Sequence, residues 1–189
     1  MCEQLAEVAK LEVAEIRHAL LEDDGAFAMQ MQFERGYITA EAYYEFFCQQ
    51  TGTRPDRSAL EHAGSDIFEP IESSINLVGA LADAGYRLGL LSNIGSVHWN
   101  FVGSGRFQPI PAAFEELVLS YQVRSVKPEP GIYQQAVSRA GVPAEEIFFV
   151  DDREENVSAA KEAGIDAVLY TSPQQLIDHL QSRNVELPV

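Results

Sequence analysis

The sequence predicts an α/β protein that has a parallel sheet with helices on both faces and a small all-helical region before it. Two observations support this fold class. From Pro70 onward, short apolar strand-like segments alternate with amphipathic helical segments, and that alternation is typical of parallel sheets with right-handed crossovers. Residues 1–69 show helical spacing of apolar residues and no convincing strand. We therefore expect a helical domain at residues 1–69 and an α/β core at residues 70–189.

Five segments of the first region have apolar residues at helical spacing. They are residues 2–10, 13–21, 26–33, 40–50 and 57–63. The hydroxyl of Thr39 can accept a backbone N–H from the first turn of the fourth helix, and Gly52 is suited to end that helix. The many aromatic residues here are expected mainly in a helical core.

The pattern of residues 70–189 predicts alternating helices and strands. Strands are expected at residues 86–91, 117–120, 147–150 and 166–170, and helices at residues 72–83, 97–102, 131–140, 153–163 and 173–182, the segment 97–102 being helical or irregular. The run from Ile147 to Val150 has four apolar residues in a row, which favours a strand buried on both faces. The resulting architecture is Rossmann-like.

Composition narrows the classes of partner. The formal net charge of -16 argues against nucleic acid and anionic membranes. No apolar run reaches membrane-spanning length, and the first ten residues lack the basic start and apolar centre of a signal peptide. The two cysteines, Cys2 and Cys48, show no metal-binding spacing. A reduced, cytoplasmic protein is the simplest expectation.

Two adjacent carboxylates, Asp151 and Asp152, directly follow the predicted strand that ends at Val150. Ligands of open parallel sheets bind beyond the carboxyl ends of the strands. Two carboxylates there repel each other, and a hard cation such as Mg²⁺ relieves that repulsion with oxygen ligands. For the pair in isolation, two solvated loop residues are the more common situation.

Two further sites carry groups suited to anions. Ser92 and Asn93 end the strand at residues 86–91, where a hydroxyl, an amide and free backbone N–H groups suit a phosphate, although a simple helix cap is the more common role. Lys127 lies beside Pro128 just before a helix, where it can neutralise an anion, although most such lysines are solvated. Each signal alone is weak, but together they follow one order along the chain.

That order resembles the haloacid dehalogenase-like hydrolase superfamily. Leu90-Leu91-Ser92-Asn93 is similar to its second motif, Val126-Lys127-Pro128 to its third, and the segment 149–157 to its fourth, acidic motif. The helical residues before these motifs resemble the family's small helical cap, and Glu34-Arg35-Gly36-Tyr37-Ile38-Thr39 is similar to a segment of the phosphatase branch. The resemblance covers nearly the whole chain.

The resemblance implies a mechanism in which an aspartate attacks a phosphoryl group and water hydrolyses the aspartyl-phosphate. By position, Ser92 and Asn93 would bind the phosphoryl oxygens, and Lys127 would bridge the nucleophile and the phosphate. Asp152 would bind Mg²⁺ directly, with Asp151 beside it or acting through water. Paired acids favour a Mg²⁺-dependent phosphatase over a metal-free 2-haloacid dehalogenase, the lesser alternative.

The resemblance also implies supporting residues and a class of substrate. Asn156 would orient the acidic loop, and Arg35 and Tyr37 of the cap are candidates for substrate contact. The expected partner is a small phosphorylated metabolite, such as a sugar phosphate. The sequence does not indicate the substrate itself or an oligomeric state.

The sequence departs from the family at its first motif. That motif is an apolar strand ending in Asp-x-Asp, ahead of the cap, and it supplies the nucleophile and a general acid/base. Residues from Met1 onward resemble the first cap helix instead. Asp23-Asp24-Gly25 is a poor substitute, because the residues before it have helical periodicity and the two acids are adjacent. We interpret it as a loop that ends a helix.

The missing strand belongs in the middle of the sheet, between residues 86–91 and 147–150. Its absence leaves unpaired backbone groups that cost on the order of 1–3 kcal/mol each if unsatisfied. Three outcomes are possible: the sequence is a truncated form of a longer protein, the flanking strands pair directly, or a segment of another copy fills the gap. The intact later motifs favour truncation.

Two classes of function therefore stay open. The first is a phosphate monoester hydrolase whose nucleophile motif lies outside this chain. The second is a non-catalytic relative that binds phosphate, Mg²⁺ or a partner. An upstream apolar strand with Asp-x-Asp would favour the first class.

Overall fold

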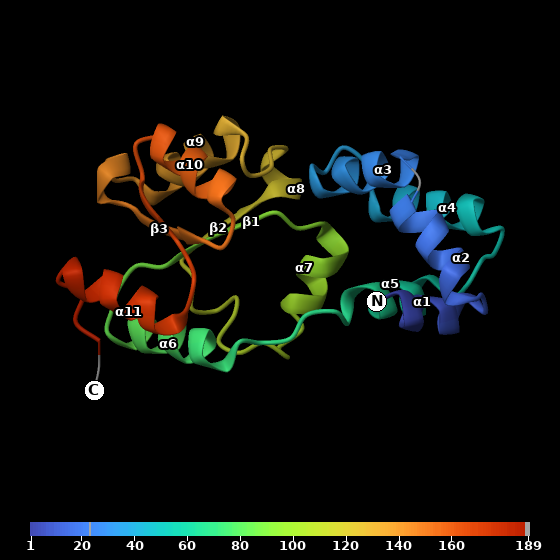
Figure 1. Cartoon of the computed structure of the whole chain (residues 1–189), viewed down its shortest axis with the longest axis horizontal. Coiled ribbons are helices and arrows are strands. Elements are labelled where there is room, and N and C mark those ends of the chain that lie inside the picture. The colour runs from blue at the N-terminus through green and yellow to red at the C-terminus, as the bar shows by residue number, and fades with distance from the viewer. Residues whose placement is uncertain (23, 188–189) are drawn as a thin grey trace.

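The structure is a computed structural model that describes residues 1–22 and 24–187. Figure 1 shows the N-terminal helices at one end of the molecule and the strands with their flanking helices at the other. The N-terminal elements are α1 (Cys2–Ala9), α2 (Val13–Arg17), the π-helical turn η1 (His18–Glu22), α3 (Asp24–Glu34), α4 (Ala40–Thr51) and α5 (Arg57–Ser65). The later elements are α6 (Glu72–Asp83), β1 (Gly89–Ser92), α7 (Ser96–Val102), β2 (Glu116–Leu119), α8 (Ser120–Val123), α9 (Pro130–Ala140), the short 3-10 helix η2 (Ala144–Glu146), β3 (Phe148–Asp151), α10 (Glu154–Glu162), β4 (Asp166–Leu169) and α11 (Pro173–Ser182).

The helices α1 to α5, here called the helical bundle, have their own apolar core. Buried residues from α1, α2, α4 and α5 form one cluster: Leu5, Ala6, Ala9, Ile16, Tyr44, Phe47, Leu60 and Ala63. The predicted N-terminal capping of α4 by Thr39 is confirmed, since the Thr39 side chain accepts the Ala42 N–H at 3.1 Å. Gly52 ends the same helix, as predicted, with φ 66°. The interpretation of Asp24 and Gly25 as a helix-ending loop is wrong, because both lie at the start of α3; Asp23 lies outside the described residues.

The four described strands form two separate parallel pairs, β1 with β2 and β3 with β4. The first strand begins at Gly89 rather than at Tyr86 as predicted. The physical reason is local, since the Tyr86 N–H donates to the Leu81 carbonyl at 3.1 Å and Gly85 has φ 83°. These residues close the C-terminus of α6, so they are not available to a strand.

Helices cover both faces of the strands. Figure 1 shows α9 and α10 on one face and α6 and α11 on the other. The face beneath α9 and α10 carries a second buried cluster: Val118, Ile132, Tyr133, Val157, Ala160, Ile165 and Ala167. This arrangement confirms the predicted α/β class with helices on both faces.

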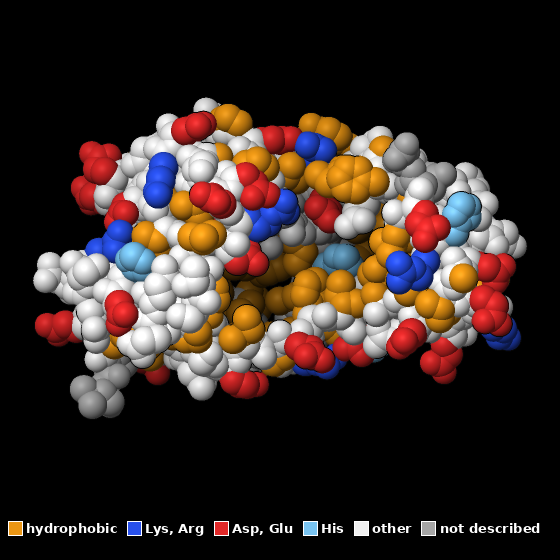
Figure 2. All heavy atoms as spheres, in the orientation of Figure 1, with side chains coloured by type: hydrophobic (Ala, Val, Ile, Leu, Met, Phe, Trp, Pro, Cys, Tyr) orange, Lys and Arg blue, Asp and Glu red, His pale blue; other side chains and the backbone are white. Residues whose placement is uncertain are grey.

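Among the described residues, no strand pairs with the edges of β1 and β3 that face away from their partners. The Leu88 carbonyl accepts the N–H of Glu115, just before β2, and the Ile147 carbonyl accepts the N–H of Asp166 in β4. Alternation therefore places the backbone groups of Leu91 and Val150 on the opposite edges. Within residues 1–22 and 24–187, β1 does not pair with β3, so the expected alternative of direct pairing does not occur. Figure 2 shows a hollow near the middle of the view, lined largely by hydrophobic side chains, where Figure 1 has the space between β1, α7 and α6.

Candidate phosphate and metal site

The centre of the candidate site is an ion pair between Lys127 and Asp151. Lys127 Nζ lies 2.6 Å from Asp151 Oδ2, and the two side chains are only 13% and 5% exposed. The same ammonium group donates to the Leu91 carbonyl at 3.0 Å, on the unpaired edge of β1. Lys127 therefore joins the end of β3 to β1 across the place where no strand pairs.

The carboxylate of Asp151 is held on its other oxygen as well. Oδ1 accepts Asn156 Nδ2 at 2.8 Å and the Arg153 N–H at 3.0 Å. Burial alone would raise the pKa of Asp151, but the hydrogen bonds from Lys127 and Asn156 outweigh burial and hold the pKa below its ordinary value. Asp151 is therefore an ionised, oriented carboxylate, and Asn156 supplies one of its hydrogen bonds. The role of Asn156 in supporting a metal-binding loop stays a prediction.

Asp152 differs from its neighbour in being exposed. Among the described residues, none donates a hydrogen bond to its carboxylate, so its oxygens are available to a cation. Mg²⁺ in proteins commonly takes one or two carboxylates and completes its shell with waters and substrate phosphate. Asp151 and Asp152 fit that donor chemistry, although the described residues contain no group of three or more metal-binding side chains.

Asn93 binds the backbone of Lys127 through both ends of its amide. Its Oδ1 accepts the Lys127 N–H at 2.7 Å, and its Nδ2 donates to the Lys127 carbonyl at 2.9 Å. This pair fixes the lysine-bearing loop to the end of β1. Ser92 is the last residue of β1 and is half-buried, without a hydrogen-bond partner for its hydroxyl among the described residues. Phosphate contacts by Ser92 and Asn93 stay predictions.

Two residues of the site region were missed by sequence reasoning. Ser120 is fully buried, and its hydroxyl accepts the Ile94 N–H at 2.9 Å and lies 2.7 Å from the Glu34 carbonyl. Glu129 Oε2 accepts the Val126 N–H at 3.1 Å. Ser120 reaches Glu34 across 86 residues and Glu129 reaches Arg35 across 94, so local patterns could not reveal these contacts. The one available signal was the position of Glu129 two residues after Lys127.

The two predicted cap contacts lie in different surroundings. The Arg35 guanidinium forms an ion pair with Glu129. Tyr37 is 59% exposed. Contact of either side chain with a substrate stays a prediction.

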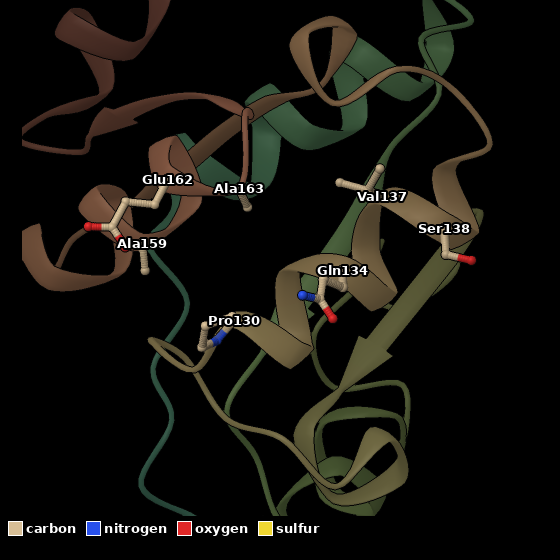
Figure 3. Close-up of a pocket in the computed structure, with 7 residues that line it drawn as sticks. All are labelled: Pro130, Gln134, Val137, Ser138, Ala159, Glu162 and Ala163. Carbon is tan, nitrogen blue, oxygen red and sulfur yellow. The ribbon is translucent and has the colours of Figure 1, made fainter.

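A groove of about 530 Å³ lies away from these residues, between α9 and α10. Figure 3 shows its lining: Pro130, Gln134, Val137, Ser138, Ala159, Glu162 and Ala163. None of the predicted site residues lines it, and its one charged side chain is a carboxylate. The groove is therefore not the candidate site.

The α/β fold places the lysine–aspartate pair at the carboxyl ends of strands, where ligands of open parallel sheets bind. A family model described as haloacid dehalogenase-like hydrolase matches residues 5–164. The chain therefore belongs to the haloacid dehalogenase-like hydrolase family. No helix in the described ranges is long and apolar enough to cross a membrane.

Curated relatives include phosphatases and a dehalogenase. The chain is 32% identical over 140 residues to D-ribitol-5-phosphate phosphatase of Bacteroides thetaiotaomicron, covering 71% of this chain and 68% of that protein. It is 28% identical over 128 residues to glyceraldehyde 3-phosphate phosphatase of Methanothermobacter thermautotrophicus, and there 65% of this chain matches only 55% of the relative. It is 29% identical over 141 residues to (S)-2-haloacid dehalogenase of Pseudomonas putida, with 73% of this chain and 61% of that protein covered.

Solved structures share the fold. A HAD family enzyme of Bacteroides thetaiotaomicron, in complex with magnesium and inorganic phosphate, has a TM-score of 0.74 and 26% identity over 90% of this chain and 84% of its own. A predicted HAD-like family hydrolase of Porphyromonas gingivalis has a TM-score of 0.77 at 21% identity, covering 97% of this chain and 88% of its own. The second likeness shows the fold alone.

Proposed function

We propose that this chain forms the phosphate- and Mg²⁺-binding part of a phosphatase that acts on a small phosphorylated metabolite. The observation that carries the proposal is the buried ion pair of Lys127 with Asp151, bonded to the unpaired edge of β1 through Leu91. It places a fixed cation and a fixed carboxylate where the ends of two parallel strands meet. Phosphatases among the relatives, and a related structure that holds magnesium and phosphate, support this choice.

Each residue of the site has a role that its surroundings favour. Lys127 neutralises charge on the phosphoryl group, and Ser92 donates a hydrogen bond to one of its oxygens. Asp152 is the first candidate to hold Mg²⁺, because its oxygens are exposed and unbonded, with Asp151 beside it. When bound, Mg²⁺ supplies further neutralisation of the phosphoryl oxygens. Asn156 keeps the Asp151 carboxylate oriented.

The nucleophile is proposed to be an aspartate on a strand that fills the gap between β1 and β3. An aspartate at the end of such a strand would lie beside Lys127, which contacts both flanking strands. Its carboxylate oxygen would form a bond to phosphorus while the ester oxygen leaves and takes a proton, and water would then release phosphate. One solved relative, an aspartate-to-alanine mutant, is described in complex with magnesium and inorganic phosphate.

A second candidate function is binding without turnover. It is favoured by a specific observation: in residues 1–22 and 24–187, no third metal-binding side chain joins Asp151 and Asp152, and both oxygens of Asp151 are engaged. A chain with this site and no nucleophile would hold phosphate and leave its ester intact. Dehalogenase activity is the lesser alternative, since the exposed Asp152 has no evident use in a metal-free reaction.

The experiment compares two forms of the protein. The first is the 189-residue chain, and the second carries an added apolar strand ending in Asp-x-Asp ahead of Met1. Both are assayed with p-nitrophenyl phosphate, with Mg²⁺ and with chelator. We expect turnover only in the extended form with Mg²⁺, and its loss when the first added Asp is replaced by Asn.

Two further variants complete the design. Asp152→Asn should abolish turnover of the extended form, and Asp178→Asn, an acid on α11 bonded to Gln174, should leave it unchanged. An extended form that binds phosphate but turns nothing over would favour the binding function. Turnover by the 189-residue chain that survives Asp152→Asn would contradict the proposed site.

A further inference from the structure

Four consecutive residues at the end of α3 and just beyond it, Phe33 to Gly36, each contact a different part of the α/β core; we call them the docking segment. The Phe33 ring packs directly on Gly95, where an added Cβ would lie 2.3 Å from Phe33 Cε1. The Glu34 carbonyl accepts the hydroxyl of Ser120 at 2.7 Å. The docking segment thus contacts the loop that follows β1 and the start of α8, which directly follows β2.

The other two residues of the docking segment make equally close contacts. Gly36 has φ 66°, and an added Cβ there would lie 2.0 Å from the Tyr121 carbonyl oxygen. Arg35 contacts Glu129 Oε1 through both Nε, at 3.2 Å, and Nη2. The side chains of this ion pair are 27% and 39% exposed, so solvent screens it only in part.

Glu129 links Arg35 to the loop that carries Lys127. While Oε1 binds Arg35, Oε2 accepts the Val126 N–H and the Ser125 hydroxyl, each at 3.1 Å. The carboxylate therefore closes the loop from Ser125 to Glu129 on itself, with Lys127 at its middle. Arg35, which lies outside this loop, holds the Glu129 carboxylate through charge-assisted hydrogen bonds from two nitrogens of its guanidinium group.

The same loop is held from the β1 side by Asn93, whose amide bonds the Lys127 N–H and carbonyl. The residue after Asn93 is Ile94, whose N–H donates to Ser120. Ser120 in turn lies against the docking segment through Glu34. Two routes therefore connect the end of α3 to the backbone around Lys127. One runs through Arg35 and Glu129, and the other runs through Ser120 and the peptide bond between Asn93 and Ile94.

We infer that Arg35 is a positioning residue. By holding Glu129, Arg35 couples the position of Lys127 to the docking of the helical bundle on the core. This role builds on the proposed function in taking Lys127 as the group that meets the phosphate. It assigns Arg35 to Glu129 rather than to the substrate. It also ties phosphate binding to the bundle, because a displaced docking segment releases the lysine-bearing loop.

The test measures the loop directly. Amide hydrogen exchange at Val126 and Lys127 is followed by NMR in the native chain, in Arg35→Gln and in Arg35→Lys. We expect Arg35→Gln to speed exchange at both amides about five-fold, because loss of a half-exposed ion pair frees the loop to open locally. Arg35→Lys keeps the charge but not the fork, so an intermediate effect is expected.

The second readout is the Lys127 side chain. The chain has three lysines, Lys10, Lys127 and Lys161, so the Lys127 side-chain signal can be assigned with a Lys127→Arg variant. We expect that signal to shift in Arg35→Gln, with affinity for inorganic phosphate falling about five-fold. The matched control is Arg54→Gln, which removes an ion pair with Glu45 inside the bundle and should move neither readout.

The outcomes are separable from those of the proposed function. Exchange at Val126 and Lys127 that is the same in Arg35→Gln as in Arg54→Gln would overturn the positioning role. Absence of phosphate binding in the native chain would count against the proposed function alone, because the exchange measurement needs no ligand. Should Arg35→Gln fail to fold, exchange in Arg35→Lys decides, since a change confined to the loop from Ser125 to Glu129 supports the role and no change overturns it.

Discussion

Lys127 and Asp151 form an ion pair that joins the two halves of a divided sheet. Their charged atoms lie 2.6 Å apart, and both side chains are largely excluded from water. Neither sheet contacts the other through strand pairing in the described ranges. The pair thus lies in the position where a central strand would end, and it combines a structural role with the chemistry proposed for the site.

Removal of the lysine should be strongly destabilising. Lys127→Met leaves Asp151 as a buried charge without its cation, and breaking such a pair costs about 3 kcal/mol. Urea unfolding at pH 7 measures this loss. In an Asp151→Asn background, Lys127→Met should cost much less. The double-mutant cycle of these two substitutions therefore gives the interaction free energy between the two side chains. Lys161→Met, at an exposed site on α10, should cost about 0.5 kcal/mol or less; an equal cost at both lysines would refute the prediction.

The local elements of the fold could be predicted from the sequence. Caps and glycines mark the helix ends: Ser172 accepts the Gln175 N–H at 3.2 Å at the start of α11, and Gly141 ends α9 with φ 67°. Boundaries were wrong where a residue had two possible roles. Tyr86 has the side chain of a strand residue, but its N–H closes α6.

The candidate site was predictable only in part. Strand ends and adjacent acids indicated Asp151 and Asp152, since topology brings strand ends to one edge. The partners of Asn93 and Glu129 were not predictable, because each is fixed by a contact between segments distant in sequence. Asn93 reaches Lys127 across 34 residues and Glu129 reaches Arg35 across 94. Side-chain type suggested a phosphate contact for Asn93, which stays a prediction, but it could not reveal the hydrogen bonds of Asn93 to the Lys127 backbone.

The unpaired edge of β3 should be visible in hydrogen exchange. The carbonyls of Ile147 and Asp151 accept N–H groups at the β4 edge, so the N–H groups of Phe148 and Val150 point to the other edge. We expect the Phe148 and Val150 amides to exchange at least about ten-fold faster than the Phe149 amide. In the extended form with an added strand, the difference should disappear. Equal protection of all three amides in the 189-residue chain would contradict an open edge.

Acid should weaken the docking of the helical bundle. Burial alone would raise the pKa of Glu129, but the hydrogen bonds from Arg35, Val126 and Ser125 outweigh it and lower the pKa below 4.5. A lowered pKa in the folded state means that Glu129 contributes stability above pH 4.5 and that this stability is lost as pH falls through the folded-state pKa.

The measurement is the difference in unfolding free energy between the native chain and Glu129→Gln. It should be largest near pH 7 and should shrink steadily below pH 4.5. Glu145→Gln, at an exposed position in η2, serves as the control. A difference that is constant with pH, or that grows in acid, would show that the Glu129 carboxylate is not favoured by its partners.

Alanine substitution at two glycines with the same φ angle can distinguish the cost of losing the docking contact from the cost of backbone strain. Gly36 and Gly52 both have φ 66°, but an added Cβ would lie 2.0 Å from the Tyr121 carbonyl oxygen at Gly36 and would meet nothing within 4 Å at Gly52. Gly52→Ala should therefore cost about 1 kcal/mol from the left-handed conformation alone. Gly36→Ala should cost a further 1–3 kcal/mol, roughly, because the clash is with backbone that cannot rotate away.

Urea unfolding of both variants measures this difference directly. If the docking segment sets the lysine-bearing loop, Gly36→Ala should also speed amide exchange at Val126, whereas Gly52→Ala should not. Equal costs for the two substitutions would mean that Gly36 does not lie against Tyr121 in solution. A large loss of unfolding free energy in Gly36→Ala with unchanged amide exchange at Val126 would mean that the docking segment joins the helical bundle to the core without positioning the lysine-bearing loop.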